Sequence, residues 1–349
     1  EYSRWQGDRM APFDRIEDRH NFTWGAIGYD HIDAANRQGT AVLDGALRHL
    51  SGRVNTLANR QGDIAAVVFN PHAWQRTDLV TTGRIHPVPG RGRGVAVKDK
   101  TGRSVPSQMI KSSDDSEGNL TMADVAFLAQ EVPGAGYDTY YLQVLPQAAP
   151  RVETDLRVDK ARLTMENEFV RVRLDPKTGG VASLVAKPSG EEMLDAAGGA
   201  YPRFTGKPTP KLSTYPNPPA YYDSGESKAQ IDWLADGPLW GTLRAQHAWR
   251  YLTFETRVTL AARSPYVEVV SRVLARVPPL ADTSPPDIKE GYWVSFVPGF
   301  NATRVLRDFP FGVEETKNPN FHALTFTDLV GGDGGLLILH AGTQYFRRE

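Results

Sequence analysis

Apolar residues near the start of the chain follow the period of a helix. They recur at alternating spacings of four and three residues, at Leu43, Leu47, Leu50, Val54 and Leu57. Because this spacing matches the 3.6-residue turn, it predicts an amphipathic α-helix from about residue 31 to residue 59. Asp33 or Thr40 is expected to cap the start of this helix, and Gly62 is expected to end it.

The predicted helix has one apolar stripe and few partners in the sequence. An isolated helix is marginal in water, so the stripe is expected to pack on other helices. Residues 1–29 have little periodicity and are expected to form a short helix and loops. Residues 1–62 are therefore interpreted as the remnant of a helical bundle. The first residue is Glu1 and not Met, and we expect the chain to be a fragment.

After Gly62 the pattern changes to short apolar runs separated by turn residues. These runs predict strands at residues 64–69, 95–97, 105–110, 122–129 and 137–144. Residues 111–119 are polar and predict a loop. Five short strands in this length predict a small antiparallel β-sandwich over residues 63–148.

Longer strands are predicted beyond a linker at residues 146–151. Alternating residues on either side of a turn at 176–180 predict a hairpin, and three long runs predict successive strands at 243–249, 252–260 and 267–277. Further strands are expected at 291–297, 323–329 and 336–340, and a long loop at 201–225. Residues 149–349 are thus expected to form a large two-sheet sandwich, truncated at its C-terminus. The predicted fold class is mainly β with a short N-terminal helical segment.

Composition narrows the possible functions. The chain has 40 basic and 41 acidic residues, so its charge gives no reason to expect a nucleic acid or a membrane surface as partner. Cysteine is absent, which excludes disulfides, thiolate metal sites and cysteine nucleophiles. No apolar run approaches the length of about 20 residues that a membrane-spanning helix needs.

The sequence contains no local catalytic signature. The carboxylate pairs Glu166/Glu168 and Glu314/Glu315 are more typical of solvated surface residues than of a glycosidase pair, which separate elements usually supply. His20 and His31 lie near the helix start, but their spacing is poor for a metal site, and two surface histidines are the simpler interpretation.

Aromatic residues gather in the region of the predicted long loop and the strands after it. They are Tyr201, Phe204, Tyr215, Tyr221, Tyr222, Trp233 and Trp240. Such rings can stack on the apolar faces of sugars, but they also close the ends of sandwiches. Both interpretations stay open.

Three segments together resemble the region downstream of the catalytic barrel in α-mannosidases of glycoside hydrolase family 38. They are residues 64–78 (with Asn70-Pro71-His72-Ala73-Trp74), 132–141 and 165–180. The resemblance implies a small sandwich followed by a large mutarotase-like β-supersandwich. It also implies a parent enzyme that is retaining, depends on zinc and cleaves α-mannosides.

The resemblance places the nucleophile, the acid and most zinc ligands in an N-terminal barrel that would precede Glu1, so no catalytic residue is expected in this chain. One family zinc ligand is a histidine where this chain has Phe22, which leaves His20 and His31 as weak candidates. Gly199-Ala200-Tyr201 matches a family segment that reaches the substrate. Tyr201 and Trp24 are therefore the expected substrate contacts, and the missing barrel is the expected partner.

Two other functions stay open at this point. One is a non-catalytic carbohydrate-binding β-sandwich protein without a catalytic parent. The other is a mutarotase-type epimerase, which would need an acid–base pair in the sandwich cleft, with His247 and His340 as the residues to test.

Overall fold

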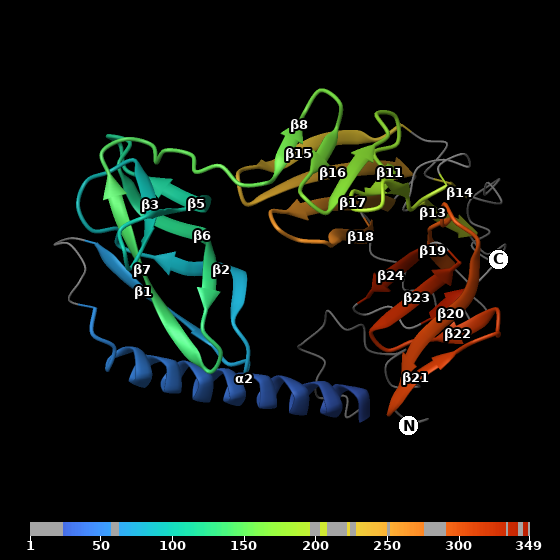
Figure 1. The fold of residues 1–349 in the computed structure, drawn as a ribbon, viewed down its shortest axis with the longest axis horizontal. Helices are drawn as coiled ribbons and strands as arrows, with labels where there is room; N and C mark the ends of the chain where they lie inside the picture. Colours follow the sequence, from blue (N-terminus) through green and yellow to red (C-terminus); the bar gives the residue numbers. More distant parts are fainter. Residues whose placement is uncertain are drawn as a thin grey trace. The chain divides into compact units, whose positions relative to one another are not determined.

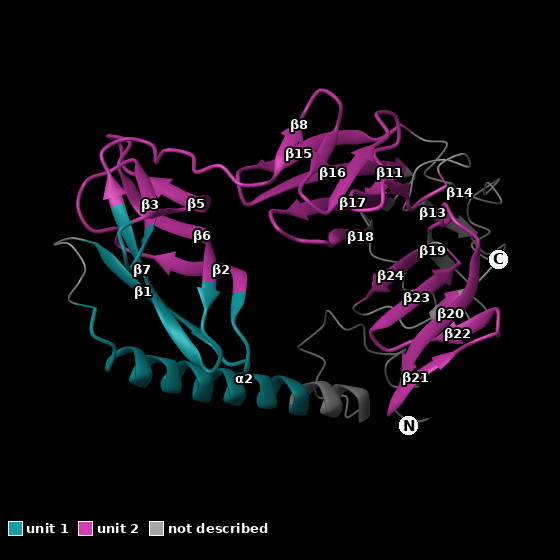
Figure 2. Cartoon of the chain, viewed as in Figure 1, with its two compact units in different colours: residues 1–76, 98–102, 131–143 teal, residues 77–97, 103–130, 144–349 magenta. Residues whose placement is uncertain are grey.

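The fold is mainly β, in the β-sandwich class expected from the sequence, and the described residues form a long helix and several antiparallel sheets (Figure 1). The computed structural model describes residues 24–56, 63–195, 203–207, 222–223, 228–249, 252–275, 291–332, 334–340 and 345–347. Two compact units alternate along the chain (Figure 2). Unit 1 comprises residues 1–76, 98–102 and 131–143, and unit 2 comprises the remainder. The predicted domain borders after residues 62 and 148 stay predictions.

The helix α2 spans Trp24–Ser51, so it begins and ends earlier than expected. Asp33 and Thr40 both lie inside α2, and the prediction that either caps it was wrong. The prediction that Gly62 ends the helix was also wrong. The chain leaves the helix at Gly52, whose amide donates to the Arg48 carbonyl at 3.1 Å. The helix then closes in tight turns, because the Arg53 amide donates to the Leu50 carbonyl at 3.0 Å and the Val54 amide donates to the Ser51 carbonyl at 3.1 Å.

The apolar stripe of α2 is largely uncovered. The exposed fractions are 73% for Val42, 56% for Leu43 and 49% for Leu50, while Leu47 is half-buried. Val54 lies beyond the helix, and Leu57 lies outside the described residues. Within the described residues, therefore, most of the stripe is exposed, and its assignment to the remnant of a helical bundle stays a prediction.

Unit 1 contains an antiparallel strand pair besides α2. The strands β1 (Ile64–Asn70) and β7 (Gly136–Leu145) pair in register from Ile64 opposite Leu142 to Asn70 opposite Gly136. Both strands were expected from their apolar runs.

Unit 2 contains a three-stranded sheet in the order β2 (Arg76–Ile85), β6 (Leu120–Val132) and β5 (Ser107–Asp114), and the strands β3 (Gly94–Asp99) and β4 (Ser104–Val105). The strand β2 was missed because its many polar residues show no clean alternation. The predicted loop at 111–119 is shorter than expected. Asp115 tightens this turn, since its Oδ1 accepts from the amides of Glu117 and Asn119, both at 2.9 Å.

The large sandwich has two antiparallel sheets in unit 2. The first has the strand order β12 (Glu191–Glu192), β11 (Val181–Ala186), β10 (Val170–Leu174), β9 (Thr164–Glu166) and β8 (Arg157–Asp159). The second has the order β15 (Gln230–Asp236), β16 (Trp240–Trp249), β17 (Leu252–Ala261) and β18 (Val267–Ala275). The predicted hairpin is the β10–β11 pair, and the three predicted long strands are β16 to β18.

Apolar side chains from both sheets form one core. Met165, Val172 and Leu174 from the first sheet pack in the same buried cluster as Leu243 and Val258 from the second. Each strand alternates inward and outward residues, so most polar residues of β16 and β17 lie on the outward face of the second sheet, with His247 and Thr256 as inward exceptions.

The turn between β10 and β11 requires glycine at position 179. Its φ is +67°, and a Cβ atom placed there would lie 2.3 Å from the Cβ of Ala245. The turn therefore requires both left-handed backbone and the absence of a side chain.

The C-terminal strands form three smaller sheets. One has the strand order β14 (Tyr222–Asp223), β13 (Arg203–Lys207) and β19 (Gly291–Ser295). Another has the order β21 (Gly312–Glu315), β20 (Ala302–Phe309), β23 (Phe326–Gly331) and β24 (Gly335–Leu339). The third is the pair β22 (Asn320–His322) and β25 (Tyr345–Arg347). No described helix combines the length and apolarity that a bilayer-spanning segment requires.

Candidate functional site

The site residues expected from the sequence fall partly outside the described chain. Trp24 and His31 lie on α2, and the His31 side chain is exposed. His20 and Tyr201 lie outside the described residues. In the part of the chain that the structure describes, no three His, Cys, Asp or Glu side chains gather as a metal-binding group. The described residues therefore do not build a zinc site around His31, and the roles of all four residues stay predictions.

The paired carboxylates are held by arginines. Glu166 Oε2 accepts from Arg171 Nε at 2.8 Å, and Glu315 Oε2 accepts from Arg304 Nε at 2.8 Å. Glu314 forms an ion pair with Arg307. Glu168 lies beyond the end of β9, so it does not share a strand face with Glu166. Each of the carboxylates of Glu166, Glu314 and Glu315 is held by an arginine at the surface, which agrees with the prediction that they are surface charges rather than an acid–base pair.

His247 is a core residue of the large sandwich. It is 4% exposed, and its Nε2 donates to the Thr178 carbonyl at 2.8 Å. Burial lowers the pKa of His247, and the Thr178 carbonyl opposes that shift only in part. A neutral, buried imidazole tied to the main chain is poorly placed to exchange protons with a sugar. The epimerase interpretation gains no support from this residue.

Asn70 joins two of the segments that the sequence analysis singled out. Its Nδ2 donates to the Trp74 carbonyl at 2.7 Å and to the Val132 carbonyl at 3.1 Å, and its Oδ1 accepts from the His72 amide at 3.1 Å. The Ala135 amide completes the junction by donating to the His72 carbonyl at 2.6 Å. Two segments that are distant in the sequence thus meet in one local structure.

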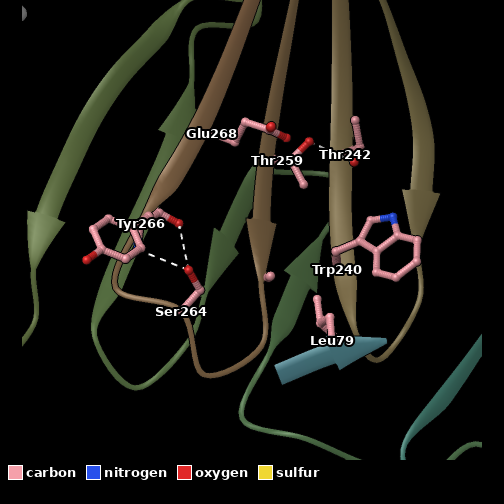
Figure 3. A pocket seen from close by; sticks show the side chains of 8 residues that line it. Leu79, Trp240, Thr242, Thr259, Ser264, Tyr266 and Glu268 are labelled. Atoms are coloured by element: carbon pink, nitrogen blue, oxygen red, sulfur yellow. Dashed lines mark hydrogen bonds between the residues drawn. The ribbon is translucent and has the colours of Figure 1, made fainter. Parts of the chain in front are cut away.

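A pocket of about 380 Å³ lies on the outward face of the second large sheet (Figure 3). Its lining residues are Leu79, Trp240, Thr242, Thr259, Ala261, Ser264, Tyr266 and Glu268. Strand register arranges them in two rows. One row has Trp240 opposite Ala261, with Tyr266 just before β18; the other has Thr242 opposite Thr259, which is opposite Glu268. The first row is mainly apolar and the second is polar.

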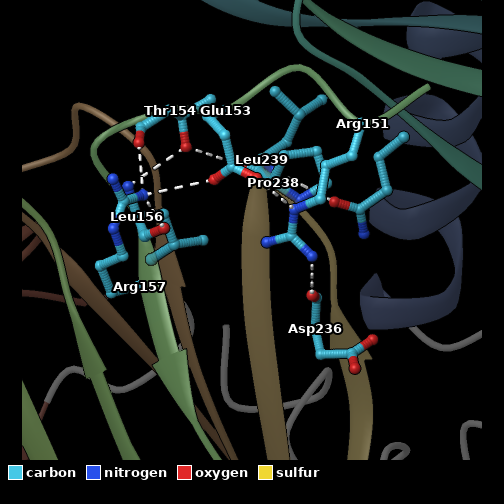
Figure 4. A network of polar contacts seen from close by, with 9 residues as sticks. Arg151, Glu153, Thr154, Leu156, Arg157, Asp236, Pro238 and Leu239 are labelled. Atoms are coloured by element: carbon cyan, nitrogen blue, oxygen red, sulfur yellow. Dashed lines mark hydrogen bonds and ion pairs between the residues drawn. The ribbon is translucent and has the colours of Figure 1, made fainter.

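The turn that precedes Trp240 is held by Arg151 and Thr154, two residues that precede β8 (Figure 4). Thr154 Oγ1 donates to the Pro238 carbonyl at 2.6 Å, and Arg151 donates to the Asp236 carbonyl at 3.4 Å. On the other side of this turn, Leu239 is fully buried with Ala126 and Leu128 of β6, and Trp240 packs against that cluster. Trp240 is therefore held by neighbours on more than one strand.

Asn167 anchors the opposite end of the pocket. This residue is 1% exposed, and its Nδ2 donates to the carbonyls of Ala261 and Ser264 at 2.9 and 2.7 Å. Its Oδ1 accepts from the amides of Phe169 and Val170, both at 2.9 Å. All four bonding positions of the amide are used, so Asn167 fixes the β17–β18 turn against the first sheet.

Sequence reasoning singled out only Trp240 of the pocket. The other lining residues come from strands whose alternation was recognised, but their grouping depends on the register between β16, β17 and β18. The alternation of apolar and polar residues shows which residues of one strand share a face. It does not show which residues of neighbouring strands lie opposite each other, so Thr242, Thr259 and Glu268 could not be grouped from the sequence.

A family model describes much of the large sandwich. Residues 165–317 match the model described as "Glycosyl hydrolases family 38 C-terminal domain". This segment is a family 38 C-terminal domain. The match begins at Met165 in β9 and includes the second sheet of the large sandwich, the first sheet except β8, and β20, so the family resemblance inferred from the sequence is confirmed for this segment.

Two solved structures share the fold of the family 38 domain and the residues before it. A protein in glycosyl hydrolase family 38 from Enterococcus faecalis is 17% identical, with a TM-score of 0.69 over 90% of this chain. An alpha-mannosidase from Enterococcus faecalis V583 is 16% identical, with a TM-score of 0.65 over 90% of this chain. The chain spans 43% and 41% of the lengths of these proteins. No curated protein matches the chain significantly.

Proposed function

We propose that this chain is the sandwich part of a glycoside hydrolase of the α-mannosidase type. The observation that carries the proposal is the family 38 C-terminal domain at residues 165–317. The fold shared with an alpha-mannosidase from Enterococcus faecalis V583 supports the α-mannosidase type, although so low an identity concerns the fold alone. Fold and function are separate questions, so the reaction needs its own test.

The proposed reaction retains the anomeric configuration and depends on zinc. The described carboxylates Glu166, Glu314 and Glu315 are paired with arginines, and the described residues gather no metal-binding group. We therefore propose that the nucleophile, the acid and the zinc ligands of the parent enzyme lie outside the described residues. The two sandwiches would then support the catalytic part, and an α-mannoside would be its substrate.

Release of 4-nitrophenol from 4-nitrophenyl α-D-mannopyranoside tests the proposal. Two proteins are compared: the 349-residue chain, and a polypeptide that carries this chain together with the sequence adjoining it in its gene. We expect turnover only by the longer polypeptide, loss of turnover after chelation, and recovery after zinc is added. Turnover by the 349-residue chain alone would contradict the assigned division of roles. A longer polypeptide that cleaves no α-mannoside would overturn the proposed reaction.

A non-catalytic carbohydrate-binding protein is the second candidate function. It is favoured by the pocket beside Trp240, in which an aromatic ring, hydroxyl groups and a carboxylate converge. The same assay separates the two candidates, because a binding protein releases no nitrophenol in either form.

A further inference from the structure

We propose that the pocket on the outward face of β16, β17 and β18 binds a single pyranose ring. The shape and the polar groups of this pocket point to such a ligand whether or not the chain is part of a glycoside hydrolase.

The floor of the pocket is formed by small side chains of β17. Thr259 and Ala261 are two residues apart and lie on the same face of the strand. Trp240 rises on one side from β16 and Tyr266 on the other, before β18 (Figure 3). A small residue between two aromatic residues leaves a shallow trough, and the volume of about 380 Å³ lies within the range of small-molecule sites.

The polar row lies along one edge of this trough. Thr242 Oγ1 and Thr259 Oγ1 are 3.0 Å apart and share one hydrogen bond, which leaves each hydroxyl further bonding capacity. Glu268 is opposite Thr259 and is exposed, and the described residues offer it neither an ion pair nor a hydrogen bond. A carboxylate with both oxygens open accepts two hydrogen bonds from neighbouring hydroxyl groups of one ligand.

The two rows are about 7 Å apart, since they are two residues apart along each strand. A ligand that satisfies both rows needs an apolar face against Trp240 and a rim of hydroxyl groups toward Glu268 and the threonines. A pyranose ring has this combination, because its C–H groups form flat faces and its hydroxyl groups project at the edge.

A cationic amine fits the arrangement less well. An aromatic cage places ring faces around one positive centre. Here Trp240 and Tyr266 stand on opposite sides of the pocket, with β17 between them (Figure 3). The hydroxyl groups of Thr242 and Thr259 also line the pocket, and their remaining bonding capacity would find no donor or acceptor on a quaternary ammonium ion.

The pocket is preorganised rather than formed by a loose loop. Ser264 Oγ accepts from the Tyr266 amide at 3.2 Å, and Asn167 holds the carbonyls of Ala261 and Ser264. Binding therefore requires little ordering of the main chain, which lowers the entropic cost of association.

Fluorine NMR of the full chain labelled with 5-fluorotryptophan tests the proposal. The chain has seven tryptophans, and the resonance that disappears in Trp240→Phe is assigned to Trp240. The probes are methyl α-D-mannopyranoside, methyl β-D-galactopyranoside, glycerol and tetramethylammonium. We expect a saturable shift of the Trp240 resonance at millimolar concentration of at least one glycoside, and none with glycerol or tetramethylammonium.

Matched variants locate the ligand. Glu268→Gln removes the charged acceptor at an exposed position and is expected to weaken binding about tenfold. Ala261→Leu fills the floor and is expected to abolish binding, whereas Ala261→Ser retains it. Trp74→Phe changes an exposed tryptophan of unit 1 and is expected to change nothing. The thermal midpoint of each variant shows whether it is folded.

Three outcomes overturn the proposal. They are the absence of a shift with every glycoside, unchanged affinity in a folded Glu268→Gln or Ala261→Leu variant, and a saturable response to tetramethylammonium that Glu268→Gln removes. The last outcome would identify a cation site instead.

Discussion

The side chain of Gln108 reaches the main chain of Leu239, its Oε1 lying 3.2 Å from the Leu239 amide nitrogen. Gln108 belongs to β5, and Leu239 follows the turn between β15 and β16. Gly237, in the same turn, leaves room for this contact, because a Cβ atom there would lie 2.0 Å from Gln108 Oε1. The amide of Gln108 therefore determines both the hydrogen bonding and the residue type of a turn far along the chain.

This relationship predicts that Gly237→Ala and Gln108→Ala act on the same contact. Gly237→Ala displaces the Gln108 side chain, and Gln108→Ala removes the acceptor, so each is expected to lower the free energy of unfolding by about 1–2 kcal/mol. In the Gln108→Ala background, Gly237→Ala should cost less than in the wild-type chain. Urea denaturation of the four proteins gives the double-mutant cycle, and additive effects would contradict the prediction.

Substitution of Asn167 is expected to loosen the β17–β18 turn. Asn167→Ala leaves the carbonyls of Ala261 and Ser264 without their donor and two amides without their acceptor, in a buried setting. The expected loss of stability is about 3 kcal/mol. Asn167→Asp retains the acceptor but places a carboxylate near two carbonyls, so it should also be destabilising at neutral pH. Asn320→Ala, at an exposed position, is the control, and thermal unfolding is the measurement.

Asp308 is expected to make stability depend on pH in the acid range. Burial raises the pKa of Asp308, but hydrogen bonds from the Thr325 hydroxyl and from the amides of Thr325, Phe326 and Leu324 outweigh it and hold that pKa well below its usual value. A folded-state pKa below the unfolded value of about 3.9 stabilises the fold above that pH. The contribution is lost as the pH falls through the folded pKa.

The variant Asp308→Asn tests this dependence. Its thermal midpoint should lie below that of the wild type at pH 7, and the difference should shrink as the pH falls below about 4. A difference that is constant from pH 7 to pH 2 would show that the charge of Asp308 is not responsible.

Substitution of an exposed leucine in the stripe of α2 is expected to cost less stability than substitution of a buried leucine in the sandwich core. Leu43→Glu should change the free energy of unfolding by no more than about 0.5 kcal/mol, because Leu43 is 56% exposed. Leu243→Ala, at a fully buried position in the sandwich core, should cost about 2–5 kcal/mol. Chemical denaturation compares the two variants. A large loss in Leu43→Glu would show that α2 is covered in solution.

Much of the fold was predictable because burial leaves a local pattern. The three long strands β16 to β18 and the β10–β11 hairpin follow from alternation and turn residues within a few positions of each other. The stripe of α2 was also visible, but its ends were not: Asp33, Thr40 and Gly62 are residue types that cap helices, yet the helix begins at Trp24 and ends at Ser51. The strand β2 was missed because few of its residues are buried.

By itself, the sequence determined the β-sandwich class, the presence of an amphipathic helix and the family resemblance of the large sandwich, because each rests on local periodicity or on contiguous segments. Only the tertiary structure decided which residues meet in the pocket. Trp240, Ala261 and Tyr266 become neighbours through the register of strands β16 to β18, and that register depends on packing across the sheet rather than on any one segment.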